Sequence, residues 1–468
     1  MVKHLPLGEL VALLKAVPIR IEAVEHQRPM RISTDSRSLQ SGDLFIALRG
    51  DRFDGNDYLG VAQQQGAIAA VTDCPPADAD LPLLVVRDAL QAYQTIAHWW
   101  RNQFAIPVIA VTGSVGKTTS KELITAVLAT QGKVLKTQAN YNNEIGVPKT
   151  LLELTPDHNF AVIEMGMRAA GEIALLTQIA RPTVAVITNV GTAHIGRLGS
   201  EQAIADAKCE LLAEMAADGV AILNFDNPRL MQTAGCFAVP AGANRLWAGK
   251  TISYGLTGGD VFGQMIDPST LQVNEMTLPL PLPGQHNAMN YLAALAVAKA
   301  LNLSWESLQQ GITVELPQGR ARRLTLPPDI VILDETYNAG LESMIAALHL
   351  LAQTPGSRRI AVLGTMKELG DRSPEFHHQV GTVVRQLELD HLLILADPAE
   401  SEALAAGAFP VPTEQFDGDE AVIDRLKALI QPGDRILFKA SRAVGLDRVV
   451  EGLRQAVSST NWAEAQTA

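Results

Sequence analysis

The chain has 468 residues, of which 47% are hydrophobic and 19% are charged, and its formal net charge is −12. This length exceeds what one hydrophobic core organises, so we expect about three domains of roughly 150 residues each, and the apolar content argues against a largely disordered chain. The acidic balance leaves no broad basic face for a nucleic-acid backbone, so an anionic ligand would need a local site such as a glycine-rich loop or a helix N-terminus.

The cysteines are far apart in the sequence. Cys74, Cys209 and Cys236 form no C-x-x-C pair, which argues against a disulfide framework or a cysteine zinc site and favours a reducing compartment. The apolar runs fall short of the roughly 18 residues that a membrane span needs. We therefore expect a soluble, cytoplasmic protein.

The predicted fold class is α/β in three domains. Residues 1–104 form a small α/β domain, because short apolar runs ("DLFIAL", "AIAAVT", "LPLLVV") alternate with turn-rich pieces such as "RGDRFDGND". This domain is expected to end near "WWRNQFAIP".

The second predicted domain, residues 105–315, contains a parallel sheet. The strands "PVIAVTG", "FAVIEMG", "TVAVITNVG" and "GVAILN" alternate with amphipathic helices, the first of which ends at about Ala129. A β-rich stretch at 245–283 and a helix from about Asn287 through Ala300 follow. Such a sheet is covered by helices on both faces and binds ligands at the carboxyl ends of its strands.

The third predicted domain, residues 316–468, is a second parallel, Rossmann-like α/β domain. Its strands are expected at "DIVILDE", "RIAVLGT", "HLLILAD" and "DRILFKA", with helical stretches between them.

The segment "IAVTGSVGKTTSKE", residues 109–122, resembles a phosphate-binding loop of the form G-x-x-x-x-G-K-[ST], but Val111 stands where the first glycine belongs. Its context fits, because a strand leads into it and a helix is expected to begin at about Lys117. Lys117 would bind the β and γ phosphates and Thr118 would offer a hydroxyl to Mg²⁺. The alternative is a simple glycine turn capped by threonine. The predicted nucleotide-binding residues of the loop are Gly113, Ser114, Val115, Gly116, Lys117, Thr118 and Thr119.

Two polar residues follow strands that neighbour this loop. Glu164 ends "FAVIE" and His194 follows "TVAVITNVG", so both could serve one or two Mg²⁺ ions, although either could equally be structural. Lys208 lies in the helical stretch "EQAIADAKCELL", where a lysine by default reaches the surface.

A set of ordered motifs resembles the Mur ligase family: "TGSVGKTT", "VIEMGM", "TNVGTAHIGRLGS", "ADAKCELL", "PGQHNAMNYLAA", "QGR", "DETYNAGLESM" and "GTMKELGDRSPEFHHQVG". The similarity runs from "TDSRSLQSGDLFIALRGDRFDGNDYL" to "FKASRAVGLDRVVEGL" and so covers most of the chain. ATP loops of this family resemble T-G-x-x-G-K-[ST]-T, which makes Val111 an ordinary strand residue.

The resemblance implies a metal site. Lys208 matches a lysine that is carbamylated in several Mur ligases, so that it carries an anionic oxygen ligand. Thr118 and Glu164 would then hold one Mg²⁺, while His194 and the carbamate of Lys208 would hold a second. The implied catalytic residues are Lys117, Lys208, His194 and Arg320.

The resemblance also implies further ATP contacts. Asn287 and Asn290 match positions near the nucleotide, with Asn290 on the adenine edge, and the alternative for Asn287 is helix capping. Arg320 of "QGR" matches an arginine that approaches the γ-phosphate when the domains close. "DETYNAGLESM" resembles D-D-S-Y-N-A-N-P-x-S-M, a loop associated with the ribose and the incoming dipeptide, and departs from it at Glu335 and Gly340.

The remaining implied contacts are with the other substrates, against the alternative of plain turn or loop packing. They are Ser36, Arg37, Asn142 and Asn143 for the nucleotide sugar, and Tyr337 and Asn338 in the third domain.

The resemblance implies ATP-dependent amide-bond formation through an acyl phosphate. The segments "NNEIGVP" and "YNAGLESM" favour the family member that joins D-alanyl-D-alanine to UDP-N-acetylmuramoyl-tripeptide, acting as a monomer. The alternatives are the ligase that adds the third amino acid, a folylpolyglutamate synthetase, and an ATP-binding switch or scaffold. Lys117, Glu164, His194 and Lys208 together argue against the scaffold, which needs no second metal ligand.

Overall fold

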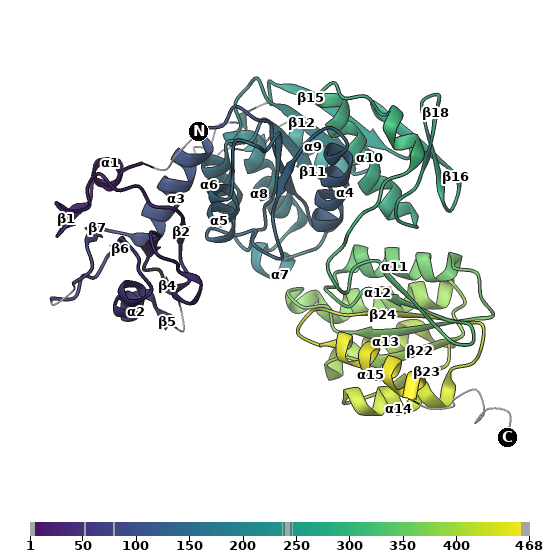
Figure 1. Ribbon diagram of the computed structural model, residues 1–468. Coiled ribbons are helices and arrows are strands. Elements are labelled where there is room, and N and C mark those ends of the chain that lie inside the picture. Colours follow the sequence, from purple (N-terminus) through teal and green to yellow (C-terminus); the bar gives the residue numbers. More distant parts are fainter. Residues whose placement is uncertain are drawn as a thin grey trace.

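The computed structural model describes residues 5–50, 53–77, 80–235, 237–238, 244–245 and 247–459. It contains three α/β domains in chain order, which Figure 1 shows from the N-terminal domain at the left to the C-terminal domain at the lower right. Cys74 and Cys209 are free thiols, and Cys236 lies outside the described residues. Within the described part of the chain, the helices lack the combination of length and apolar character that a membrane crossing requires.

The N-terminal domain is the small α/β unit that the sequence predicts. α1 (Leu7–Leu14) and α3 (Ala89–Arg101) cover one face of its sheet and α2 (Leu59–Gln64) covers the other. The strands run in the order β1 (Val17–Ile19), β7 (Leu83–Val85), β6 (Ala69–Thr72), β3 (Leu44–Ile46) and β2 (Ile32–Ser33). Only the pair of β1 and β7 is antiparallel among these neighbours. β4 (Arg49–Gly50) and β5 (Phe53–Asp54) form a separate short hairpin.

The central domain is built on a large, mostly parallel sheet. Its strands run in the order β18 (Met276–Pro279), β17 (Thr270–Val273), β16 (Val261–Asp267), β15 (Lys250–Gly255), β12 (Val220–Asn224), β11 (Val184–Ile187), β8 (Val108–Thr112), β10 (Phe160–Glu164) and β9 (Val134–Lys136). The pairs from β9 to β16 are parallel, and β16, β17 and β18 form an antiparallel extension. The predicted parallel sheet and the β-rich stretch after it are both confirmed.

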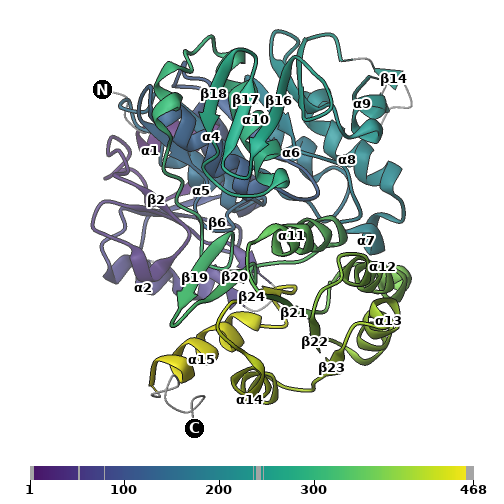
Figure 2. The ribbon, with the colours of Figure 1, turned by 90° about the vertical axis from the view of Figure 1, so that its right-hand side faces the viewer.

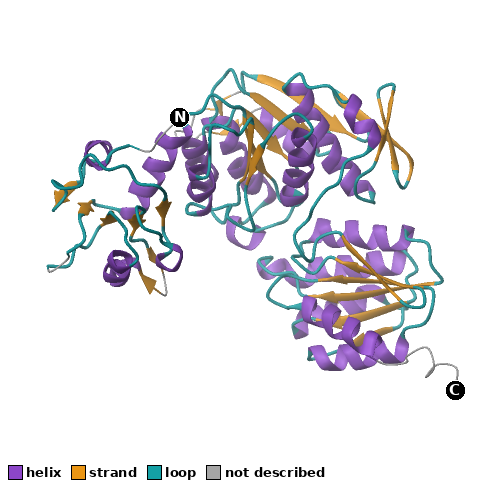
Figure 3. Ribbon diagram, viewed as in Figure 1, coloured by secondary structure: helices purple, strands orange, loops and turns teal. Residues whose placement is uncertain are grey.

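Helices cover both faces of this sheet, as Figure 3 shows. α4 (Lys117–Ala129) and α10 (Gln285–Ala300) pack on one face, and α5 (Gly146–Leu152), α6 (Glu172–Ala180), α8 (Glu201–Glu214) and α9 (Pro228–Gly235) pack on the other. Ile109 and Val111 of β8 contact the first set, while Val108 and Ala110 contact the second. This double burial explains why the strand is apolar throughout, since it has no solvent-facing side.

The C-terminal domain has the second predicted sheet. Its strands run in the order β19 (Arg322–Leu326), β20 (Ile330–Asp334), β24 (Asp434–Lys439), β21 (Arg358–Gly364), β22 (His391–Leu395) and β23 (Thr413–Gln415), with β19 antiparallel at one edge. α11 (Leu341–Gln353), α12 (Ser373–Gln386) and α13 (Pro398–Ala408) cover one face, and α14 (Asp419–Leu429) and α15 (Leu446–Ser459) cover the other. Figure 2 shows α11 and α12 on the side of the domain that meets the central domain, beside α7 (Ile195–Leu198).

Helix α3 joins the first two domains. Its first half packs in the N-terminal core through Ala89, Tyr93 and Ile96, whereas Trp100 belongs to the core of the central domain. The Trp100 indole also donates a hydrogen bond to the Leu154 carbonyl at 3.1 Å. The predicted boundary at residue 104 thus lies just after a helix that both domains share. The limits of the three domains remain a prediction.

The packing predicts which substitutions destabilise the central domain. Leu292 of α10 is fully buried, so Leu292→Ala should lower the free energy of unfolding by about 2–5 kcal/mol through lost burial and the cavity left behind. Ile266, which is 60% exposed, offers the matched Ile266→Ala control with a change below about 0.5 kcal/mol. Hydrogen exchange of the α10 amides in urea would measure the free energy of unfolding of both variants. An equal loss of stability in Leu292→Ala and Ile266→Ala would contradict this packing.

Candidate functional site

A cavity of about 530 Å³ lies where the central and C-terminal domains meet. The carboxyl ends of β8, β10 and β11 form its floor, the position at which parallel sheets bind ligands. The predicted residues that line it are Ser114, Val115, Gly116, Lys117, Thr118, Thr119, Asn142, Asn143, Glu164, His194, Asn287, Asn290, Arg320, Glu335, Tyr337 and Asn338. Most of the sequence-predicted site is therefore assembled in one place, with contributions from two domains.

The loop after β8 has the backbone that a phosphate loop needs. Gly116 caps α4 with a left-handed φ of 80°, and a Cβ there would lie 2.6 Å from the Asn290 amide oxygen. A Cβ on Gly113 would collide with the Thr188 hydroxyl, so both positions require glycine. α4 begins at Lys117, as predicted, and its first residues line the cavity, where a helix N-terminus favours an anion.

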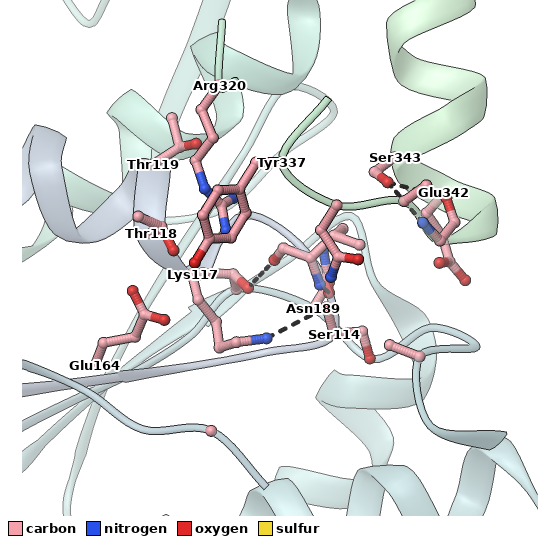
Figure 4. Close-up of a pocket in the computed structure, with 18 of the residues that line it drawn as sticks. Ser114, Lys117, Thr118, Thr119, Glu164, Asn189, Arg320, Tyr337, Glu342 and Ser343 are labelled. Carbon is pink, nitrogen blue, oxygen red and sulfur yellow. Dashed lines mark hydrogen bonds between the residues drawn. The ribbon is translucent and has the colours of Figure 1, made fainter. Parts of the chain in front are cut away.

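The Lys117 amine folds back onto this loop. It donates hydrogen bonds to the Gly113 carbonyl at 2.6 Å and to the Ser114 carbonyl at 3.3 Å. Figure 4 shows the second of these bonds. Burial lowers the pKa of Lys117, and Arg320 lowers it further while Glu164 opposes the change. Lys117 is partly buried, and a cation in that position with few anions nearby favours an anionic ligand.

Glu164 has a buried carboxylate, of which only one oxygen is hydrogen-bonded within the described residues. Oε1 accepts a hydrogen bond from the Asn142 amide at 2.8 Å, whereas Oε2 has no hydrogen-bond partner among the described residues and lies 3.9 Å from the Lys121 amine. Thr118, which is also buried, lies beside it in Figure 4. A free carboxylate oxygen near a hydroxyl suits Mg²⁺, which takes oxygen ligands. The residues present therefore fit a magnesium ion.

His194 lies at the rim of the cavity and contacts the C-terminal domain. Its Nδ1 is 2.6 Å from Oε2 of Glu368, an ion-pair distance, although the ring N–H is not aligned with that oxygen for a hydrogen bond. The contact with His194 is the main cause of the lowered pKa of Glu368. The described residues contain no cluster of three His, Cys, Asp or Glu side chains that could hold a metal by themselves.

Lys208 is buried, with 1% exposure, so the expectation that it reaches the surface is wrong. It faces the interior from α8 and does not line the cavity itself. Burial lowers the pKa of Lys208 well below its usual range, and the nearby Lys117 cation adds to the effect. The neutral amine is thus favoured at this position.

The two predicted nucleotide-binding residues of α10 are linked, since the Asn290 amide donates a hydrogen bond to the Asn287 amide oxygen at 3.4 Å. The Ser120 hydroxyl donates to the Asn290 amide oxygen at 3.1 Å, and the Asn287 amide donates to the Pro283 carbonyl at 2.8 Å. The helix is capped by Gly284, so the alternative that Asn287 caps it is wrong.

The C-terminal domain brings cations and an aromatic ring to the cavity. The Arg320 guanidinium lies 4.1 Å from the centre of the Tyr337 ring, and Arg320 Nε is buried with no hydrogen-bond partner in the described structure. Figure 4 shows the Tyr337 ring against Arg320, with its hydroxyl toward Lys117. Glu335 accepts a hydrogen bond from the Ala321 N–H at 3.1 Å, and burial raises the pKa of its carboxyl.

Other predicted residues lie apart from the cavity or have local partners. Ser36 and Arg37 belong to a 3₁₀ turn (Ser36–Ser38) of the N-terminal domain, where Arg37 pairs with Asp35 at 2.8 Å. Neither residue lines the cavity. Asn143 lines it but also accepts the Gly146 N–H at 2.9 Å near the start of α5. Gly340 is the N-cap of α11, where a Cβ would meet no neighbour within 4 Å.

Several cavity residues were missed in the sequence. Asn189 accepts the backbone N–H groups of Ser114 and Val115, at 3.1 and 3.0 Å, and so anchors the phosphate loop. Lys439 donates to the Asn338 carbonyl at 3.0 Å. Both residues sit within the quoted motifs "TNVG" and "FKASR", so motif membership was the available signal. Glu342 and His286 also line the cavity and likewise sit within quoted motifs, "DETYNAGLESM" and "PGQHNAMNYLAA".

Comparison with known proteins identifies the family. Residues 30–98 match the Mur ligase family catalytic domain, residues 111–298 the Mur ligase middle domain, and residues 319–442 the Mur ligase glutamate ligase domain. A Synechocystis protein named UDP-N-acetylmuramoyl-tripeptide–D-alanyl-D-alanine ligase is 58% identical over 92% of this chain and 93% of its own length. The chain belongs to the Mur ligase family. The Escherichia coli protein of the same name is 36% identical over 91% of this chain and 93% of its own.

Solved Mur ligase structures have the same fold over nearly the whole chain. The structure of MurF from Acinetobacter baumannii has a TM-score of 0.86 and 32% identity, covering 96% of this chain and 99% of that one. The MurF ligase of Thermotoga maritima in complex with ADP has a TM-score of 0.80 and 29% identity, covering 92% of this chain and 98% of that one. The predicted three-domain Mur ligase fold is therefore confirmed.

The site predicts a pH dependence of stability. Burial, and secondarily the Lys439 cation, lowers the pKa of His286 to about 4, so the folded chain keeps this ring neutral. An unfolded histidine has a pKa of about 6.5, so between about pH 6.5 and 4 the unfolded state binds more protons and stability falls as the pH is lowered. His286→Gln should flatten this part of the curve, whereas His26→Gln, on a side chain that is 94% exposed, should not. Urea unfolding at several pH values measures both, and parallel curves for His286→Gln and the unmodified protein would contradict the assignment.

Proposed function

We propose that this chain is an ATP-dependent amide ligase. It joins D-alanyl-D-alanine to UDP-N-acetylmuramoyl-tripeptide through an acyl phosphate, in the cytoplasmic stage of peptidoglycan precursor synthesis. The observation that carries this proposal is the convergence of Lys117, Glu164 and Arg320, from two domains, on one cavity at the end of a parallel sheet. The names of relatives that match more than 90% of the chain support the choice of substrates.

The first step is phosphoryl transfer. The terminal carboxylate of the tripeptide attacks the γ-phosphorus of ATP, which breaks the bond to the β,γ-bridging oxygen and releases ADP. Lys117 and Arg320 stabilise the charge on the transferring group, and the loop N–H groups hold the phosphates in place. The unpartnered Arg320 Nε is a donor that such an oxyanion can satisfy.

The second step forms the amide. The free amine of D-alanyl-D-alanine attacks the acyl carbon, the carbon–oxygen bond to phosphate breaks, and the amine loses a proton. Both substrates must be aligned and protected from water, since water would otherwise hydrolyse the acyl phosphate. A cavity closed by two domains suits this requirement.

We assign Mg²⁺ binding to two sets of residues. Thr118 and Glu164 form one set, supported by the unpartnered carboxylate oxygen of Glu164. His194 and a carbamate on Lys208 form the other, which makes two ions. When bound, Mg²⁺ would neutralise triphosphate charge and polarise the γ-phosphoryl group.

The carbamate on Lys208 has a physical basis in the fold. A neutral amine attacks carbon dioxide and loses one proton to give the carbamate. The buried position lowers the pKa of Lys208 and so favours the neutral amine, which supports this modification.

The remaining contacts complete the proposal. Asn287, Asn290 and Glu335 would bind the nucleoside of ATP. The protein would act as a monomer. The UDP-linked substrate would extend to the N-terminal domain, with Ser36, Arg37, Asn142 and Asn143 as its contacts. Tyr337 and Asn338 would contact the ribose and the incoming dipeptide.

The test of this function is phosphate release by the purified protein. ATP, Mg²⁺, UDP-N-acetylmuramoyl-tripeptide and D-alanyl-D-alanine are supplied together and then omitted one at a time. Release that needs all of them, with the UDP-linked pentapeptide as product, is the expected result. ATP binding without such release would favour a switch or scaffold, and release with a free amino acid in place of the dipeptide would favour the ligase that adds the third residue.

Removing the loop lysine should abolish most of the activity. Lys117→Met should lower kcat by about 10²–10³-fold, because a preorganised charge on the transferring phosphoryl group is lost. Lys133→Met, on a side chain that is 58% exposed, is the matched control and should leave kcat within about twofold. Phosphate release measures both variants, and a Lys117→Met enzyme as active as the control would refute the role of Lys117.

A further inference from the structure

A buried lysine lies behind Thr118 and Glu164, and the ligase mechanism gives it no role. Lys121 follows Lys117 on α4 by about one turn, is 1% exposed and does not line the cavity. Its amine donates a hydrogen bond to the Thr137 carbonyl at 2.8 Å. Lysine is almost never buried to this extent unless carboxylates accompany it.

Two carboxylates pair with Lys121. Oε1 of Glu122 lies 3.0 Å from its amine, and Oε2 of Glu164 lies 3.9 Å from it. The Glu122 carboxylate also accepts a hydrogen bond from the Lys136 amine at 2.5 Å. We call Lys121, Glu122, Lys136 and Glu164 the α4 charge cluster. Its two lysines balance its two glutamates, so the α4 charge cluster carries no net charge.

Within this cluster, Glu164 depends on Lys121 for its opposite charge. Oε2 of Glu164 is buried and has no hydrogen-bond partner in the described part of the chain. Oε1 accepts a hydrogen bond from the Asn142 amide, which is neutral. A buried carboxylate is unfavourable unless an opposite charge accompanies it. The Lys121 amine, at 3.9 Å, therefore compensates the charge of Glu164 from within the protein.

Thr137 fixes the distance between these two charges. Its carbonyl accepts the hydrogen bond from Lys121, and its hydroxyl accepts the backbone N–H of Glu164 at 2.9 Å. Thr137 is itself fully buried. Lys121 cannot move away from the carboxylate without breaking a buried hydrogen bond, which is costly.

We propose that Lys121 is the resident counter-ion of Glu164 and that it disfavours binding of a divalent cation to this carboxylate in the absence of nucleotide. The inference rests on the proposed function, in which Thr118 and Glu164 bind Mg²⁺, and it adds how that site is regulated. A fixed cation close to a ligand oxygen repels a metal ion, and salt screens this repulsion less inside a protein than at its surface. The phosphates of a nucleotide supply the negative charge that outweighs the repulsion, so the metal binds together with the nucleotide.

The test is the affinity of the full-length protein for Mn²⁺ without nucleotide, measured by EPR of the free ion. Lys121→Met removes the charge and keeps most of the length of the side chain, so we expect Mn²⁺ to bind about tenfold more tightly or better. Lys121→Gln, which is also neutral but keeps a donor for Thr137, should change the affinity in the same direction. Lys133→Met is the matched control, because the Lys133 amine lies 3.8 Å from Asp157 in an exposed ion pair, and it should bind Mn²⁺ like the unmodified protein.

A second substitution locates the effect. Glu164→Gln added to Lys121→Met should remove the gain in Mn²⁺ affinity, because the carboxylate that attracts the ion is lost. A gain that persists in this double variant would place the Mn²⁺ at another carboxylate and overturn the role of Lys121 as the counter-ion of Glu164.

A purely structural role of Lys121 predicts a different result. If Lys121 only holds α4 in place, both neutral variants would bind Mn²⁺ as weakly as the unmodified protein or more weakly, and that outcome would overturn the inference. Lys121→Gln decides between the two roles if Lys121→Met does not fold.

The outcomes also separate this inference from the proposed function. Phosphate release that needs the full set of substrates would support the ligase reaction even if the neutral variants bound Mn²⁺ no more tightly. Tighter Mn²⁺ binding in Lys121→Met that depends on Glu164 would support the counter-ion even if the unmodified protein released no phosphate.

Discussion

The arrangement of the molecule follows from one electrostatic constraint, the burial of lysines around a single cavity. Lys117 and Lys439 border the cavity from two domains, Lys208 lies behind it, and burial is the main cause of the lowered pKa of each. Holding the Lys117 and Lys439 ammonium groups away from water is unfavourable unless an anion accompanies them, whereas burial favours the neutral amine of Lys208. Glu164, Glu335 and Glu342 supply part of that compensation, and a triphosphate would supply much more. The cavity therefore carries positive charge that its own carboxylates compensate only in part, and this charge favours binding of an anionic nucleotide. Residues from both domains contribute to it.

The buried strands and helices around the cavity hold these charged side chains in place. The strands that end at the cavity are apolar on both faces, so their carboxyl ends have fixed positions, and α4 starts directly after the loop. Asn189 and Ser114 tie the loops after β8 and β11 together, and Glu342 and Glu368 tie the second of these loops to the C-terminal domain. A shift of the C-terminal domain would therefore move Arg320 and disturb the surroundings of His194 at the same time. We therefore expect nucleotide binding, the metal site and the arrangement of the domains to change together.

Part of the fold and of the candidate site could be predicted from the sequence, because that part depends on local patterns. The apolar runs of β8, β10 and β11 and the start of α4 follow from hydrophobic periodicity and from the glycine spacing of the loop. The burial of Lys208 could not be predicted, because the sequence of α8 does not reveal which side of the helix meets the sheet. The contact between His194 and Glu368 joins residues 174 positions apart and depends on how two domains meet, which no local pattern encodes. The expected roles of Lys208 and Arg320 came from the family resemblance, and the capping alternative for Asn287 was wrong because Gly284 already occupies the cap.

The central claim is that the carboxylate of the tripeptide takes the γ-phosphoryl group of ATP before the amide forms. The most direct measurement uses UDP-N-acetylmuramoyl-tripeptide with ¹⁸O in its terminal carboxylate, followed by mass spectrometry of the released phosphate. The acyl-phosphate pathway predicts that each phosphate carries one oxygen from the carboxylate, because that oxygen leaves with phosphorus when the amine attacks. Phosphate without ¹⁸O, formed at the same rate as the amide product, would contradict the account.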